Sequence, residues 1–145
     1  MPNVVFDTVV FVRCLINPHS IWGNLVYTYK AKYTLYLSIP VIKEIVEVIE
    51  RPKLKQKYHT TQEHGVRQLL QILFHANVVD IETIPTASRD IKDDKFLATA
   101  KAAKADYLVS EDQDLLTLGQ YEGTQIIDAE TFLKVLERIF KEARP

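Results

Sequence analysis

The chain has 145 residues, of which 47% are hydrophobic and 26% are charged, a composition typical of a globular protein rather than a disordered one. This length allows one domain with a sizeable core, so we expect residues 1–145 to form a single domain. The formal net charge of −1 excludes a global basic field that would attract nucleic acid, and any such binding would depend on a local patch or on metal ions. The single cysteine, Cys14, excludes an internal disulfide and favours the cytoplasm. We expect neither a membrane-spanning segment nor a signal peptide, because no apolar run has the required length or flanks.

An apolar run rich in β-branched residues, 4–12, opens the chain and predicts a strand that is buried on both faces. Asp7 lies in the middle of this run. Because an unpaired buried charge is costly, this carboxylate needs a cation, a hydrogen-bonding partner or a place at the end of the strand. The simplest interpretation is that Asp7 caps the turn that leaves the strand. The alternative is a metal ligand, which requires that other carboxylates converge on it.

The rest of the chain alternates between helical and extended patterns. We expect helices over residues 21–30, 38–51, 60–74, 95–104, 115–118 and 128–140, strands over 33–37, 77–81, 105–110 and 124–127, and a polar loop over 85–93. This alternation predicts an α/β fold, a three-layer α/β/α sandwich with a mostly parallel central sheet. In such sheets ligands bind beyond the carboxyl ends of the strands, at a topological switch point. Two acidic residues lie where this rule points: Asp7, near the exit of the first strand, and Asp112, just past the strand that ends at Ser110.

Several acidic residues are predicted to converge at this edge of the sheet: Asp7, Glu44, Asp93 or Asp94, and Asp112 with Asp114. Carboxylates that lie together repel one another, and the arrangement becomes favourable when Mg²⁺ or Mn²⁺ bridges them. Two such ions about 3.5–4 Å apart can clamp a phosphodiester and activate a water molecule. Each residue alone has a simpler explanation, as a solvated helix position or a helix cap. Spacing alone therefore indicates only an α/β domain in which a metal site is one interpretation.

Four segments together carry a resemblance to a known family. They are Val-Phe-Asp-Thr at 5–8, the region 38–54 with its central glutamate, Asp-Ile-Lys-Asp-Asp-Lys-Phe at 90–96, and the acidic stretch at 106–116. In this order they resemble the PIN domain family, and within it the VapC-like toxin components of toxin–antitoxin systems. The resemblance implies a Mg²⁺- or Mn²⁺-dependent endoribonuclease that hydrolyses phosphodiester bonds of single-stranded RNA. It also implies a homodimer and a small antitoxin protein as partner.

The resemblance assigns roles to residues of this chain. The catalytic, metal-binding residues would be Asp7, Glu44, Asp94 and Asp112, with Asp114 as a further ligand. The residues that support these ligands would be Thr8, Ser110 and Asp93. Separately, basic residues near the acidic motifs are candidates for contacts to RNA phosphates, with an exposed, solvated surface as the alternative: Arg51, Lys53, Lys55, Lys92 and Lys95.

Val9 departs from the family pattern, which places an asparagine there. A valine side chain cannot hydrogen-bond, so a second interpretation stays open: a PIN-like module that binds RNA or protein with weak or no nuclease activity. A small-molecule phosphohydrolase is a third, weaker interpretation, because none of the four glycines forms a phosphate-binding loop. Glu111 adds a charge beside Asp112 with no consequence that the sequence reveals, and Trp22 is a candidate for a subunit interface.

Overall fold

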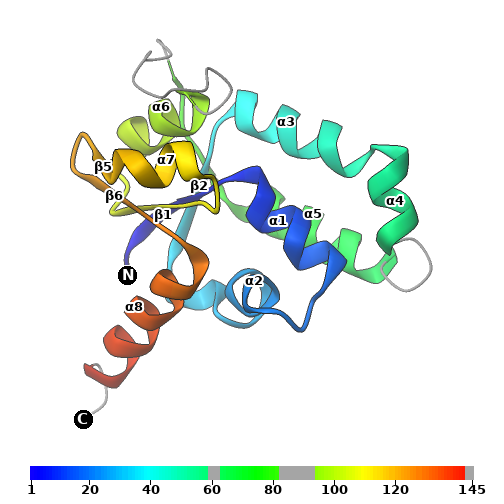
Figure 1. Ribbon diagram of the computed structural model, residues 1–145, viewed down its shortest axis with the longest axis horizontal. Helices are drawn as coiled ribbons and strands as arrows, with labels where there is room; N and C mark the ends of the chain where they lie inside the picture. Colours follow the sequence, from blue (N-terminus) through cyan, green and yellow to red (C-terminus); the bar gives the residue numbers. More distant parts are fainter. Residues whose placement is uncertain (59–62, 82–93, 143–145) are drawn as a thin grey trace.

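The computed structural model describes residues 1–58, 63–81 and 94–142 (Figure 1). Its elements, in chain order, are β1 (Asn3–Phe6), α1 (Thr8–Ile16), α2 (Ile21–Gly23), a π-helix η1 (Asn24–Thr28), a 3₁₀-helix η2 (Lys30–Lys32), β2 (Thr34–Leu37), α3 (Ile39–Ile49), α4 (Pro52–Tyr58), α5 (Glu63–His75), β3 (Asn77–Val78), α6 (Asp94–Ala103), β4 (Tyr107–Val109), α7 (Gln113–Leu118), β5 (Gln120–Tyr121), β6 (Thr124–Ile127) and α8 (Ala129–Glu142). Within these ranges no helix combines the length and the hydropathy needed to cross a membrane.

The strands form one sheet in the order β3-β2-β1-β4-β6-β5. All neighbouring strands pair in parallel except β5 and β6, which are antiparallel. The prediction of a mostly parallel α/β sheet is therefore confirmed. The chain moves outward from β1 through β2 to β3 and then returns to place β4 on the other side of β1. The topological switch point thus lies between β1 and β4, and a ligand is expected beyond their carboxyl ends.

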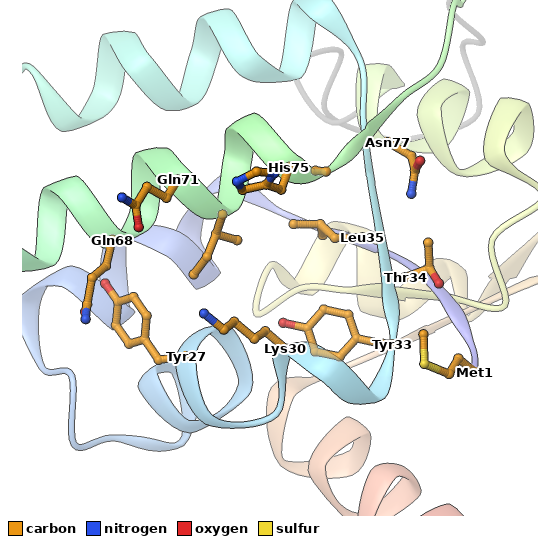
Figure 2. Close-up of a pocket in the computed structure, with 12 residues that line it drawn as sticks. Met1, Tyr27, Lys30, Tyr33, Thr34, Leu35, Gln68, Gln71, His75 and Asn77 are labelled. Carbon is orange, nitrogen blue, oxygen red and sulfur yellow. The ribbon is translucent and has the colours of Figure 1, made fainter.

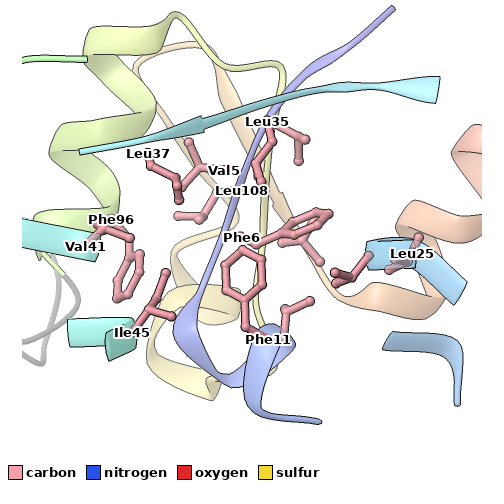
Figure 3. Close-up of a cluster of buried hydrophobic side chains, with 14 of the residues drawn as sticks. Val5, Phe6, Phe11, Leu25, Leu35, Leu37, Val41, Ile45, Phe96 and Leu108 are labelled. Carbon is pink, nitrogen blue, oxygen red and sulfur yellow. The ribbon is translucent and has the colours of Figure 1, made fainter. Parts of the chain in front are cut away.

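Helices cover both faces of the sheet, which gives the predicted three-layer sandwich (Figure 1). Phe6 is fully buried, and its ring lies 5.7 Å from that of Phe11 in α1 and 6.0 Å from that of Phe132 in α8. Since successive residues of a strand face opposite sides, the preceding Val5 faces the other layer, where α6 packs on β1, β2 and β4 (Figure 3). The core therefore packs against β1 from both faces of the sheet.

The predicted strand over residues 4–12 is wrong beyond Phe6. β1 ends there, Asp7 becomes the N-cap of α1, and the rest of the apolar run is helical. The buried residues of α1 recur at helical spacing: Val10, Phe11, Cys14 and Leu15. A short apolar run is compatible with a buried strand or a buried helix, and here tertiary packing overrides the β propensity of the valines.

The predicted helix over residues 21–30 is also interrupted. α2 has three residues, then the chain continues as the π-helix η1 and the 3₁₀-helix η2. Gly23 marks a close approach of two backbone segments, because a Cβ at this position would lie 1.9 Å from the carbonyl oxygen of Pro18. Only a glycine fits there without a shift of the backbone.

Two further elements were not predicted, and two predictions lie outside the described residues. The basic stretch after Arg51 forms α4, and the two-residue strand β5 is too short to give a sequence pattern. The other helices and strands occur within a few residues of their predicted bounds. The predicted loop at 85–93 and the predicted cap residues 60–62 lie outside the described residues.

Candidate active site

A pocket of about 850 Å³ lies beyond the carboxyl ends of β1 and β4, at the switch point of the sheet. It is lined by Asp7, Thr8, Val9, Val12, Pro40, Lys43, Glu44, Glu47, Val48, Arg51, Lys95, Phe96 and Asp112. The structure thus brings together three of the predicted metal ligands, Asp7, Glu44 and Asp112. They come from three different parts of the chain, namely the end of β1, the helix α3 and the loop after β4.

Asp7 is the most deeply placed of these three carboxylates, with 4% of its surface exposed. One oxygen, Oδ1, accepts a hydrogen bond from the backbone N–H of Val9 at 3.0 Å, and Oδ2 accepts one from the Ser110 hydroxyl at 2.5 Å. Burial raises the pKa of Asp7, and the charges of Asp112 and Glu44 raise it further, while the two hydrogen bonds act in the opposite direction. The groups acting on its pKa are therefore neutral donors and other carboxylates, an environment that a bound cation would complement.

Ser110 connects the two carboxylates at the ends of β1 and β4. Its hydroxyl donates to Asp7 and accepts the backbone N–H of Asp112 at 2.9 Å. Asp112 in turn caps α7, because its Oδ1 accepts the N–H of Asp114 at 2.8 Å. The role of helix cap and a place in the pocket are therefore compatible for Asp112, and the same holds for Asp7 at the start of α1.

Glu44 is held by two side chains from other elements. Its Oε1 accepts from the Lys95 ammonium at 2.7 Å, and its Oε2 accepts from the Thr8 hydroxyl. The Lys95 and Glu44 side chains are 22% and 20% exposed, so this ion pair is largely shielded from solvent. In the described ranges, no three or more carboxylate, imidazole or thiolate groups lie close enough together to hold a metal ion. Both oxygens of Glu44 are engaged by protein groups in this arrangement.

Two predicted ligands do not line the pocket. Asp94 is buried, with 1% exposed, and begins α6 directly before Lys95. Asp114 lies in the first turn of α7. Asp93, predicted as a supporting residue, lies outside the described residues.

Two of the five basic residues predicted to contact RNA phosphates line the pocket, and the others do not lie among its described lining residues. Arg51 and Lys95 line the pocket, and Arg51 also forms an exposed ion pair with Glu47 at 3.1 Å. Lys53 and Lys55 lie on α4 and are not among the lining residues. Lys92 lies outside the described residues.

Sequence reasoning missed Glu47 and Lys43 as lining residues. The lining residues of α3, together with the residue that follows its C-cap, recur at intervals of three and four. They therefore share one face, at positions 40, 43, 44, 47, 48 and 51. This spacing is the signal that would have placed both residues beside Glu44.

Glu111 has a role that the sequence did not reveal. Its Oε1 accepts from the indole N–H of Trp22 at 3.1 Å and from the backbone N–H of Ala129 at 3.0 Å. The Trp22 ring also lies under the Arg13 guanidinium, 4.7 Å from its centroid. Glu111 therefore ties α2 and the start of α8 to the loop that carries Asp112.

Replacing Glu111 with alanine is expected to lower the free energy of unfolding by about 1.5–3 kcal/mol, because two hydrogen bonds to a charged acceptor are lost. Glu130→Ala is the matched control, since that side chain is 70% exposed and its only described ion pair spans 3.8 Å. Urea unfolding followed by the fluorescence of Trp22, the single tryptophan of the chain, measures both variants. Equal losses in the two variants would contradict this role of Glu111.

A second pocket, of about 690 Å³, lies at the opposite ends of β1 and β2, against α5 (Figure 2). Its lining includes Lys30, His75 and the amides of Gln68 and Gln71. No carboxylate is among the described residues that line it. Of these two pockets, carboxylates line only the one at the switch point.

Comparisons with known proteins agree with this fold. Residues 3–114 match the family model described as PIN domain. The uncharacterised protein MJ1680 of Methanocaldococcus jannaschii is 32% identical over 117 residues, which is 80% of this chain and 74% of that protein. The crystal structure of PAE2754 from Pyrobaculum aerophilum superimposes with a TM-score of 0.61 at 17% identity, over 94% of this chain and 90% of that one. The structure of VapBC2 from Rickettsia felis, bound to a DNA fragment from their promoter, gives a TM-score of 0.56 at 14% identity, over 87% of this chain and 98% of that one.

PIN domains are generally nucleases and typically use divalent metal ions. The family match covers most of the chain and includes Asp7, Glu44 and Asp112, three of the four acidic residues that line the pocket. The chain belongs to the PIN domain family.

Proposed function

We propose that this protein is a metal-dependent endoribonuclease that hydrolyses phosphodiester bonds of single-stranded RNA. The observation that carries the proposal is the convergence of Asp7, Glu44 and Asp112 on one pocket at the switch point of the sheet. Carboxylate oxygens are the preferred ligands of Mg²⁺ and Mn²⁺. The buried position of Asp7, whose pKa is raised by burial and by its carboxylate neighbours, also suits a site that a cation completes.

In this proposal Asp7, Glu44, Asp94 and Asp112 hold the metal, and Asp114 is a further ligand. When bound, the metal would activate a water molecule and neutralise charge on the phosphodiester. Ser110 and Thr8 keep Asp7 and Glu44 oriented through the hydrogen bonds described above. Asp93 stays a predicted supporting residue. The basic residues proposed to contact RNA phosphates are Arg51, Lys53, Lys55, Lys92 and Lys95.

The valine at position 9 is compatible with catalysis. Its backbone N–H, rather than its side chain, donates to Asp7, and this donor is present with any residue other than proline. The carboxylate is therefore oriented without the asparagine that is usual at this position. This favours the nuclease over a module that only binds RNA or protein.

We also propose that the chain, as one domain over residues 1–145, is the toxin component of a toxin–antitoxin pair in the cytoplasm and forms a homodimer. The likeness to the VapBC2 fold and the single, buried free cysteine support this. Trp22 is engaged within the chain by Glu111, so a better candidate interface is offered by the exposed apolar side chains of α3 and α5: Ile39, Val46, Leu70 and Phe74. Sedimentation at the mass of a monomer across the micromolar range would remove the homodimer from this proposal.

Cleavage of a labelled single-stranded RNA tests the proposed activity. Wild-type protein is expected to cleave with Mn²⁺ or Mg²⁺ and to stop cleaving in excess EDTA. An Asp112→Asn protein, purified in parallel, reports any contaminating ribonuclease. Cleavage that persists in EDTA, or that is equal in the variant, would reject the proposal. A folded wild-type protein that binds RNA without cutting it would favour the binding-only function.

Removing the Ser110 hydroxyl is expected to weaken Mn²⁺ binding by about 10-fold, because partners that orient metal ligands contribute on this scale. Ser110→Ala leaves Asp7 without its hydroxyl donor and the N–H of Asp112 without its acceptor. Thr124→Val is a matched control, since it removes another buried hydroxyl, bonded to the carbonyl of Ala105. Calorimetric titration with Mn²⁺ compares the two variants. The role of Ser110 would be contradicted if both bound Mn²⁺ as the wild-type protein does.

A further inference from the structure

The position of Lys95 is unusual for a lysine in a helix. It is the second residue of α6, where the positive end of the helix dipole disfavours a cation. Its ammonium is nevertheless held in a partly buried place, 2.7 Å from Oε1 of Glu44, with both side chains about four-fifths shielded from solvent. The interaction with Glu44, rather than the stability of α6, therefore accounts for a lysine at this position.

The same interaction engages Glu44, which lines the pocket at the switch point of the sheet. Glu44 accepts from Lys95 through one oxygen and from Thr8 through the other, so its oxygens are directed at protein donors. Asp7 and Asp112 line the pocket with it. Within the described part of the chain, no three such groups are gathered closely enough for a metal ion. An internal cation thus takes one of the contacts that an external cation would need.

We infer that Lys95 is the built-in counter-ion of this site, which holds Glu44 in the metal-free protein and must release it before Glu44 can bind a divalent cation. This inference rests on the proposed function and concerns the control of metal binding at the same pocket. Lysine suits the task, because its charge lies at the end of a flexible stem that can leave one partner without moving the backbone. Thr8, a neutral donor, adds no charge that competes with the metal.

A purely structural ion pair between α3 and α6 would behave differently. Removing such a pair would destabilise the fold and would leave the metal affinity unchanged or lower, because Glu44 would be less well placed. Removing a competing counter-ion instead makes the pocket more negative and frees an oxygen of Glu44, so the affinity rises. An unchanged or lower affinity therefore excludes the counter-ion role, and the labelling of Lys95 described below reports its release directly.

The test is calorimetric titration of Mn²⁺ into wild-type, Lys95→Met and Lys101→Met proteins. Lys101 is exposed in the last turn of the same helix, so its replacement makes the same change in net charge outside the pocket. Lys95→Met is expected to bind Mn²⁺ at least about fivefold more tightly than wild type, and Lys101→Met is expected to match wild type. An affinity of Lys95→Met that is equal to or below that of wild type overturns the inference but leaves the proposed function intact. Failure of the wild-type protein to bind Mn²⁺ overturns both.

A second measurement uses the wild-type chain and does not depend on the folding of a variant. Acetic anhydride labels free lysine amines, and mass spectrometry reports the rate at each lysine. If Mg²⁺ releases Lys95, its ion pair with Glu44 is broken and its amine becomes free to react. Mg²⁺ is then expected to speed the labelling of Lys95 about threefold or more relative to that of Lys101. An unchanged ratio with saturating Mg²⁺ overturns the inference.

Discussion

Asp7→Asn is expected to abolish RNA cleavage and to weaken Mn²⁺ binding at least about 100-fold, while the metal-free protein becomes more stable than wild type. The loss follows because Asp7 is the carboxylate placed deepest in the pocket. The gain follows because the asparagine removes a buried charge and can still form a hydrogen bond with each of the two partners. Its Oδ1 can accept from Val9, and its amide can donate to the Ser110 hydroxyl, which has a lone pair left after accepting from Asp112.

The stability difference should also depend on pH in a defined direction. Burial raises the pKa of Asp7 above its ordinary value of 3.8, so the folded protein binds this proton more readily than the unfolded chain does. The free energy of unfolding of the metal-free wild-type protein therefore falls as the pH rises from the pKa of Asp7 in the unfolded chain to its higher pKa in the folded protein. It stays lower at neutral pH. The Asp7→Asn variant has no carboxylate at this position, so its free energy of unfolding does not show this fall with pH.

Urea unfolding in EDTA, from pH 4 to pH 8, measures this difference. The stability of Asp7→Asn relative to wild type should grow as the pH rises and then level off. Asp80→Asn, at an exposed position, is the control and should change the free energy of unfolding by less than about 0.5 kcal/mol. A variant that is less stable than wild type at pH 7, or that retains the Mn²⁺ affinity of wild type, would contradict the role given to Asp7.

Phe6→Ala is expected to lower the free energy of unfolding by about 3–5 kcal/mol, the usual cost of removing a buried aromatic ring. Phe6 is fully buried, and the rings of Phe11, Tyr33 and Phe132 surround it at centroid distances of 5.7, 5.3 and 6.0 Å. Small domains are stable by only about 5–15 kcal/mol, so this one change removes a large share of the total.

Phe74→Ala provides the matched control, because that ring is 84% exposed. Its free energy of unfolding should stay within about 0.5 kcal/mol of wild type, unless Phe74 is buried against another copy of the chain. Denaturant unfolding at low protein concentration compares the two variants. Equal costs for both would show that the core is not organised around β1 as described.

The features of the fold that were predictable are those with a repeating pattern or a strong chemical constraint. The alternation of helices and strands gave the parallel sheet, and the acidic residues after β1 and β4 gave the switch point. The helical continuation after Asp7 was not predictable, because apolar valines suit a buried helix as well as a buried strand. The π-helix η1 and the short strand β5 have no sequence pattern of their own.

In the candidate site, single residues were predictable from the sequence, whereas contacts between residues far apart in the chain were not. Asp7, Glu44 and Asp112 were singled out by spacing and family resemblance, and the structure places them around one pocket. The pairing of Lys95 with Glu44 could not be foreseen, since 51 positions separate them and only tertiary packing brings α3 and α6 together. The contact between Glu111 and Trp22, 89 positions apart, is of the same kind.

Crystals grown with Mn²⁺ and measured for anomalous scattering would test the central claim most directly. The proposal predicts an anomalous peak in the acidic pocket, within about 2.5 Å of carboxylate oxygens of both Asp7 and Asp112. It also predicts that Glu44 has left Lys95. A pocket without a peak at saturating Mn²⁺, with the Glu44–Lys95 pair retained, would contradict the metal-dependent nuclease that we propose.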